Sequence, residues 1–208
     1  MATSGPREVP PALAGELGEL YGVEQDLEAA KNYCERLKRE LSDFASADWV
    51  LVEALSEAAI IRYARCFTTG SRINLDPALL EPEARKVHDW FWNLRSKHIA
   101  HSVNEFENWS VTVHVVEPPD PPAVYGVSMG AGRVGGLSPE LVGMLEVLCD
   151  VLLAYLGSRI EKKRAAVEEA VHSRPMDEVY SWGEPLVFPP PSGLDVARRR
   201  QHQGRRHP

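Results

Sequence analysis

Arg95 and His101 have the clearest chemical potential in the chain, and they lie six positions apart. An imidazole takes up and releases a proton near neutral pH, and a guanidinium binds phosphate through two parallel hydrogen bonds. On a helix, six residues correspond to a rise of about 9 Å, so both side chains can border one small cleft. These two groups are a minimal set for cleaving RNA without a metal ion.

A helix that begins near Pro82 and ends near His101 is needed to position this pair. Proline suits the first turn of a helix, and apolar residues then recur at helical spacing: Val87, Trp90, Phe91 and Leu94. The same spacing continues into His98 and His101, so the buried face becomes titratable at its C-terminal end.

Three further helices are predicted around it. A stripe at alternating spacings of three and four predicts a long amphipathic helix: Leu20, Val23, Leu27, Ala30, Cys34, Leu37 and Leu41. Residues 47–67, with Ser46 as the N-cap, are apolar on most faces and predict a central buried helix, in which Glu57, Arg62 and Arg65 are exceptions. Ser138 and Pro139 open a last long helix with an inner face of Leu141, Leu145, Leu148, Leu152 and Tyr155.

Between these helices, the sequence alternates with a period of two, which predicts strands. Trp109, Val111, Val113 and Val115 form the first, and residues 123–129 the second, followed by a glycine-rich linker at 130–136. The expected fold is therefore all-α, with a β-hairpin inserted at about residues 107–130 of a helical domain spanning 12–172. Residues 1–11 are expected to be a disordered arm, and 173–208 a disordered tail rich in proline and arginine.

The segment Leu94-Arg95-Ser96-Lys97-His98-Ile99-Ala100-His101-Ser102 resembles the HEPN-domain motif of an arginine, four to six residues and a histidine. The resemblance is closest to abortive-infection members, and Tyr63-Ala64-Arg65-Cys66-Phe67-Thr68-Thr69-Gly70 also looks like the end of their second helix. It implies a HEPN-like helical bundle that forms a homodimer and acts as a metal-independent ribonuclease, as a toxin or in phage defence. Arg95 and His101 would be its catalytic residues. Lys97 and His98 are the expected RNA-binding residues, and an antitoxin or regulator protein is an expected partner.

Other interpretations of these residues remain open. Arg95 could form an ion pair with Glu57, while His98 and His101 favour the negative end of the helix dipole. A metal site could use His98, His101, His114 and Glu105, but neither a His-Glu-x-x-His pattern nor paired cysteines are present, so no metal or other cofactor is expected. The second function considered is a catalytically silent helical module that dimerises and binds a protein or nucleic acid. Ser96 favours it, because active HEPN members most often have Asn, Asp or His there.

The charge distribution and the cysteine content limit the partners and the cellular location that we expect. Residues 1–172 hold 17 Lys and Arg against 26 Asp and Glu, a net charge of -9, while residues 173–208 hold six arginines against four acids, a net charge of +2. An acidic body disfavours nonspecific adhesion to nucleic acid, so an RNA site must be a local cleft. Three widely spaced cysteines fit reduced thiols packed in the core, and the most apolar stretch, near 148–156, is interrupted by Asp150. We therefore expect a cytoplasmic protein without a membrane segment.

Overall fold

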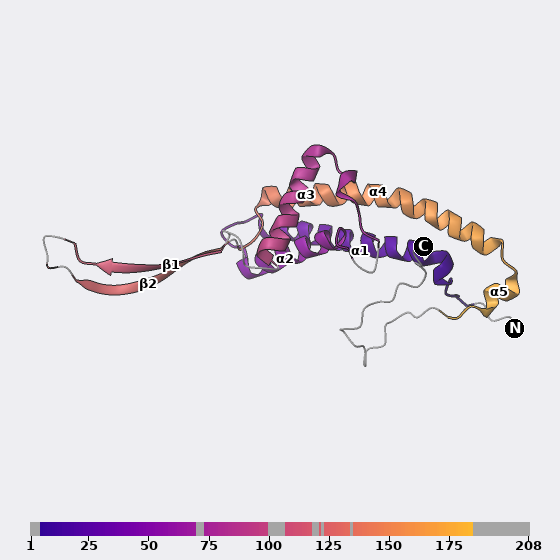
Figure 1. Ribbon diagram of the computed structural model, residues 1–208, viewed down its shortest axis with the longest axis horizontal. Coiled ribbons are helices and arrows are strands. Elements are labelled where there is room, and N and C mark those ends of the chain that lie inside the picture. Colours follow the sequence, from indigo (N-terminus) through magenta and orange to yellow (C-terminus); the bar gives the residue numbers. More distant parts are fainter. Residues whose placement is uncertain are drawn as a thin grey trace.

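The chain is mostly helical, and its two strands pair as one antiparallel hairpin (Figure 1), as the sequence predicts. The computed structural model describes residues 5–69, 73–99, 107–117, 121, 123–133 and 135–184. The helices are α1 (Pro11–Glu40), α2 (Trp49–Arg65), α3 (Pro82–Leu94), α4 (Pro139–His172) and α5 (Met176–Ser181), with a short 3-10 helix at Pro77–Leu79. The strands are β1 (Glu107–Val115) and β2 (Val124–Arg133).

The two longest helices, α1 and α4, lie side by side and antiparallel (Figure 1). Lys31 near the middle of α1 forms an ion pair of 2.7 Å with Asp150 of α4. Towards the start of α1, Glu16 pairs with Lys163, much later in α4. The apolar stripe of α1 from Leu20 to Leu41 is buried as predicted. It packs against α2 and against the buried face of α4, which consists of Val142, Leu145, Leu148, Cys149, Leu152, Leu156 and Ile160.

Two N-caps were expected from the sequence, and one is as predicted. Ser138 accepts a hydrogen bond from the Leu141 amide at the start of α4. Asp48 caps α2 instead of Ser46, because its carboxylate accepts from the amides of Val50 and Leu51 at 3.1 Å. The Ser46 hydroxyl is hydrogen bonded to Asp43 within the preceding turn, so helix α2 begins at Trp49.

The predicted ends of several elements also differ from the structure. Strand β2 continues to Arg133, so residues 130–132 belong to the hairpin rather than to a linker, and the hairpin spans 107–133. Helix α5 lies inside the range 173–208 that was expected to be disordered, and the Glu8 amide donates to the Gly183 carbonyl at 2.8 Å. Residues 185–208 are outside the described part of the chain.

Helix α4 has a composition that can be interpreted in two ways. Among the described helices it alone has the length and mean hydropathy, 1.8 over an 18-residue window, of a membrane-spanning helix, and 33% of that window is buried inside the protein. Central helices of helical bundles have the same composition.

Candidate functional site

The motif segment begins where α3 changes its winding. Helix α3 ends at Leu94, and Arg95–Ile99 continue as one π-helical turn. Single π-helical turns are rare in proteins, and those that occur are frequently at functional sites. His88, Phe91 and Leu94 are the buried residues of α3, so the face of α3 that meets the core leads directly to this turn.

Arg95 is half-buried at the junction between α3 and the π-helical turn. In the part of the chain that the structure describes, no ion pair joins its guanidinium to Glu57 or to another carboxylate, which was one interpretation of the sequence. Lys97 is exposed two residues further along. His101, the other half of the predicted pair, lies in residues 100–106, outside the described residues.

His98 faces α2 rather than open solvent. It lines a small cavity, about 20 Å³, together with Glu53 and Glu57 of α2 and with Gly136 and Leu137 before α4. This volume is close to that of one water molecule and far below that of a nucleotide. The two carboxylates give this side of the motif an acidic character.

The chain returns from the hairpin to the bundle beside this cavity, through a close contact with α2. The Leu137 amide donates to the buried Ser56 hydroxyl at 3.0 Å, and that hydroxyl donates to the Val52 carbonyl at 2.7 Å. A Cβ atom on Gly136 would lie 2.8 Å from a methyl group of Val52. Glycine therefore allows the close approach that holds the base of the hairpin against α2.

A buried histidine, His88, was not singled out from the sequence. Its Nδ1 lies 2.9 Å from the hydroxyl of Tyr63, and its ring packs on Phe67 with centroids 4.3 Å apart. Burial lowers the pKa of His88 and raises the pKa of Tyr63. The signal was its spacing, since His88 precedes Phe91 by three residues and lies on the buried face, whereas the predicted member Trp90 is 37% exposed. Both rings are neutral in the fold and form part of the core.

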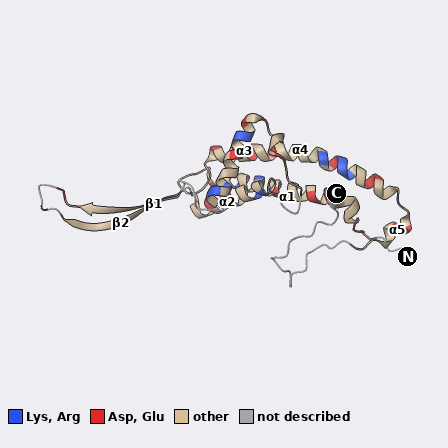
Figure 2. Cartoon of the chain, in the orientation of Figure 1, with Lys and Arg blue, Asp and Glu red and all other residues tan. Residues whose placement is uncertain are grey.

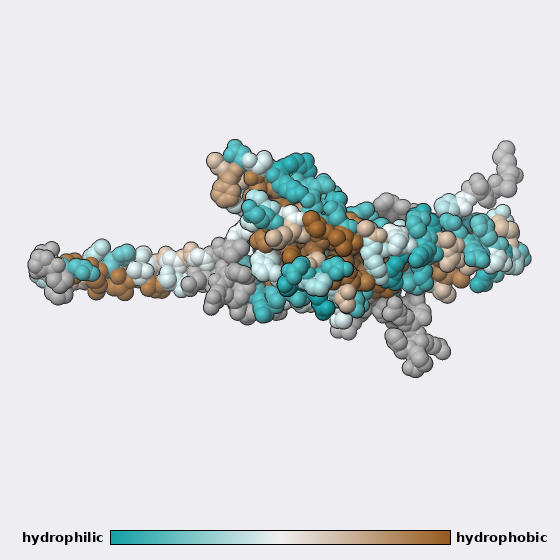
Figure 3. Space-filling model, turned by 90° about the horizontal axis from the view of Figure 1, so that it is seen from above, coloured by the Kyte–Doolittle hydropathy of each residue, from teal (hydrophilic) through white to brown (hydrophobic). Residues whose placement is uncertain are grey.

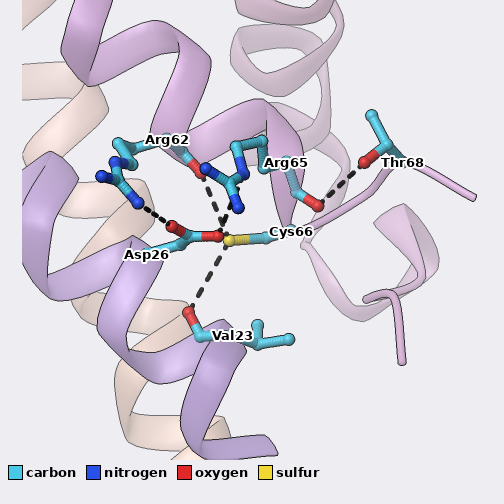
Figure 4. A network of polar contacts seen from close by, with 6 residues as sticks. All are labelled: Val23, Asp26, Arg62, Arg65, Cys66 and Thr68. Atoms are coloured by element: carbon cyan, nitrogen blue, oxygen red, sulfur yellow. Dashed lines mark hydrogen bonds and ion pairs between the residues drawn. The ribbon is translucent and has the colours of Figure 1, made fainter. Parts of the chain in front are cut away.

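A buried carboxylate accounts for the two arginines of α2 that broke its apolar pattern. Asp26 of α1 is 2% exposed, and its oxygens lie 2.7 Å from Arg62 and 3.4 Å from Arg65 (Figure 4). The hydrogen bond to Asp26 raises the pKa of Arg62. Cys66 lies beside them, with its thiol 3.5 Å from the Arg62 carbonyl. The cluster joins α1 to α2, and both arginine side chains still reach solvent.

An open groove of about 520 Å³ lies between α3 and α4, on a different surface from the small cavity. Its floor is apolar, with Val87, Met144 and Val147, and Lys38 and Glu146 stand at its side. Met144 and Val147 are exposed. Its titratable residues are Glu140 and the ion pair of Lys38 with Glu146.

No group of three or more His, Cys, Asp or Glu residues able to hold a metal occurs among the residues described. His114, one member of the alternative metal set, lies on the hairpin and is hydrogen bonded to Ser128 at 2.8 Å. The three cysteines are free and buried, as predicted, and burial raises the pKa of Cys34 to about 12. Such thiols remain protonated and unreactive near neutral pH.

Comparison with protein-family models, with curated proteins and with solved structures found no match.

Proposed function

We propose that the chain is a metal-independent endoribonuclease of the HEPN type that acts as a homodimer, with Arg95 and His101 as its catalytic residues. One observation carries the proposal. The guanidinium of Arg95 lies half-buried at the start of a π-helical turn and is not engaged by a carboxylate of the described chain. A guanidinium binds a phosphate through two parallel hydrogen bonds, so this side chain can take the RNA backbone as its anionic partner.

The chemistry proposed for the pair requires a ribose. His101 removes the proton of a 2′-hydroxyl, whose oxygen then attacks the adjacent phosphorus. Arg95 stabilises the negative charge that builds on the phosphate oxygens. The bond to the 5′-oxygen breaks, this oxygen takes a proton from water, and the products carry a 2′,3′-cyclic phosphate and a 5′-hydroxyl. Lys97, which is exposed two residues after Arg95, is proposed to contact the RNA backbone.

Steady-state cleavage of a fluorescent single-stranded RNA by purified variants tests the proposal. Arg95→Ala and His101→Ala should each lower the rate by about a hundredfold, because each removes a separate contribution to the transition state. Arg95→Lys should also be slow, since an ammonium keeps the charge but loses the two-pronged contact with phosphate. Lys162→Ala, on the exposed surface of α4, is the matched control and should cleave like the wild type. Equal rates for the wild type and the His101 variant would exclude the proposed mechanism.

The catalytically silent binding module is the second candidate, and the carboxylates beside His98 favour it. Glu53 and Glu57 would repel a phosphate placed on that side of the motif. If the wild type leaves RNA intact, this module becomes the better explanation. A role as a toxin or in phage defence, controlled by an antitoxin or regulator protein, belongs to the nuclease proposal and depends on cleavage being observed.

A further inference from the structure

The hairpin extends away from the helices (Figure 1). From Trp109 to Val115 on β1, and on the residues that pair with them on β2, one of its faces is apolar. Residues opposite one another in an antiparallel pair point to the same face. Trp109 pairs with Ala131, Val111 with Met129, and Val113 with Val127. All of their large side chains are exposed, with Met129 at 84% and Trp109 at 73%. Figure 3 shows hydrophobic residues following the hairpin.

A β-bulge keeps this face continuous at the outer end of the hairpin. The register shifts between His114 and Val115, so Val115 pairs with Val124 although His114 pairs with Gly126. The extra residue, Tyr125, lies beside the His114 ring at a centroid distance of 5.7 Å. The bulge therefore places Tyr125 toward the polar face and returns Val124 to the apolar face.

The opposite face of the hairpin is more polar. It carries Ser110, Thr112 and His114 on β1, and glycines, Ser128 and the bulged Tyr125 on β2. An isolated two-stranded hairpin is marginally stable in water and needs a surface to pack against. An exposed apolar face of several hundred Å² also marks an interaction site.

We propose that this face binds the same face of a second copy of the chain, so that two hairpins pack as a small β-sandwich. Residues 108–116 and 123–132 contain no Lys, Arg, Asp or Glu (Figure 2), and at the base of the hairpin Glu107 is opposite Arg133, so the charges there are of opposite sign. A fully exposed aromatic side chain presents on the order of 200 Å² and an aliphatic one less, so the face offers roughly 600 Å² per copy. Two copies would bury about 1,200 Å², the lower limit of a standard protein interface.

The acidic charge of the segment between the two strands disfavours binding to a lipid surface and favours one orientation of the two copies. Between the strands lie two acidic residues, Glu117 and Asp120, and no basic residue. Anionic lipid headgroups repel such a loop, and its charges are costly to bury in a bilayer. The same charges would repel each other if two hairpins packed with their loops together. The twofold arrangement therefore places the loop of one hairpin beside the base of the other, with the middle of β1, near Val111, close to its own copy.

Analytical ultracentrifugation of the full-length chain tests the contact with a matched pair of substitutions on neighbouring residues. Val113→Asp places a charge on the apolar face and should weaken self-association by about a hundredfold or more. Thr112→Asp places the same charge on the polar face and should dimerise like the wild type. Both variants should keep the helical circular dichroism signal, because both side chains are exposed.

Disulfide cross-linking tests the orientation, since the native cysteines are buried. Val111→Cys should form a covalent dimer under mild oxidation, and Thr112→Cys should not. A monomeric wild type, or a Val113→Asp variant that dimerises as well as the wild type, would overturn the proposal. So would dissociation by Val147→Asp in the groove of α4 but not by Val113→Asp, or hairpin-dependent binding of a monomer to phosphatidylcholine vesicles. Association is measured without RNA, so the two proposals can fail separately. A monomeric wild type would remove the homodimer from the proposed function but not the cleavage chemistry, and intact RNA would leave the hairpin contact standing.

Discussion

The buried pair of His88 and Tyr63 should make stability depend on pH in the range where histidine titrates. Burial lowers the pKa of His88 in the folded protein, so the folded state holds the neutral ring. The unfolded chain binds a proton at this residue near pH 6.5. Below about pH 6.5 the unfolded state therefore binds more protons than the folded state, and acid lowers the free energy of unfolding. Above that pH both states are neutral, and the contribution of His88 to stability is fully present.

The size of this change in the free energy of unfolding follows from the binding of one proton to His88 in the unfolded state alone. His88 is 2% exposed and its Nδ1 is engaged by Tyr63 at 2.9 Å, so the folded state resists protonation. A single excluded proton changes the free energy of unfolding by up to about 1.4 kcal/mol per pH unit. Between about pH 7 and about pH 5.5, His88 should therefore lower stability by at most about 1.3 kcal/mol.

Urea unfolding followed by far-ultraviolet circular dichroism measures this difference at the two pH values. The double variant Tyr63→Phe/His88→Phe removes both polar groups, so it leaves neither partner unsatisfied. It should lose the pH-dependent contribution of His88, whereas Tyr63→Phe alone should keep it. The remaining histidines and carboxylates are common to all variants, and their contributions cancel in the comparison. If the wild type and the double variant lose the same free energy on acidification, His88 is not held neutral by burial and the reasoning is refuted.

Three other substitutions or deletions test the packing around the site, each by urea unfolding at neutral pH. Asp26→Asn should lower the free energy of unfolding by about 1–3 kcal/mol, because it weakens the contacts with Arg62 and Arg65. Its control, Asp150→Asn in the exposed pair with Lys31, should lower it by at most about 1 kcal/mol. Equal losses in the two variants would contradict the importance of burial. Gly136→Ala should lower the free energy of unfolding by about 1–3 kcal/mol, because the added methyl group overlaps α2. Its control, Gly143→Ala, adds a methyl group that meets nothing within 4 Å and should be neutral or stabilising. A neutral Gly136→Ala variant would show that the approach to α2 is not tight. Removal of residues 173–208 should change stability by less than about 1 kcal/mol because α5 contains no buried residue, and a large loss would show that this segment supports the helices.

The helices that carry long, regular apolar stripes could be predicted from the sequence, because apolar residues that recur at helical spacing share one face, and burial of that face is favourable. Every residue of the α1 stripe from Leu20 to Leu41 is buried. The alternation from Trp109 to Val115 likewise forms strand β1. The second strand was predicted too short, since glycines at 130 and 132 suggest a linker but also fit a strand that faces solvent.

The polar contacts inside the core could not be predicted, because they depend on pairing between distant helices. Asp26 lies on the buried stripe of α1 and is balanced by Arg62 and Arg65 on α2, which no spacing within α1 reveals. His88 was passed over because histidine is not counted as apolar, although its position matches the buried face of α3. The cap of α2 was assigned to Ser46 rather than Asp48, since both types cap helices well and only the turn geometry separates them. At the site itself, the sequence predicted the helix that carries Arg95 but not the change to a π-helical turn at that residue.

Incubation of the purified protein with single-stranded RNA in excess chelator, followed by mass analysis of the ends produced, tests the central claim most directly. In the proposed mechanism His101 removes the proton of a 2′-hydroxyl and Arg95 stabilises the charge on the phosphate, so the fragments should end in a 2′,3′-cyclic phosphate. A substrate of the same sequence with deoxyribose at every position should remain intact. Intact RNA, cleavage of the deoxyribose substrate, or cyclic phosphate formed equally by the His101→Ala variant would contradict the claim.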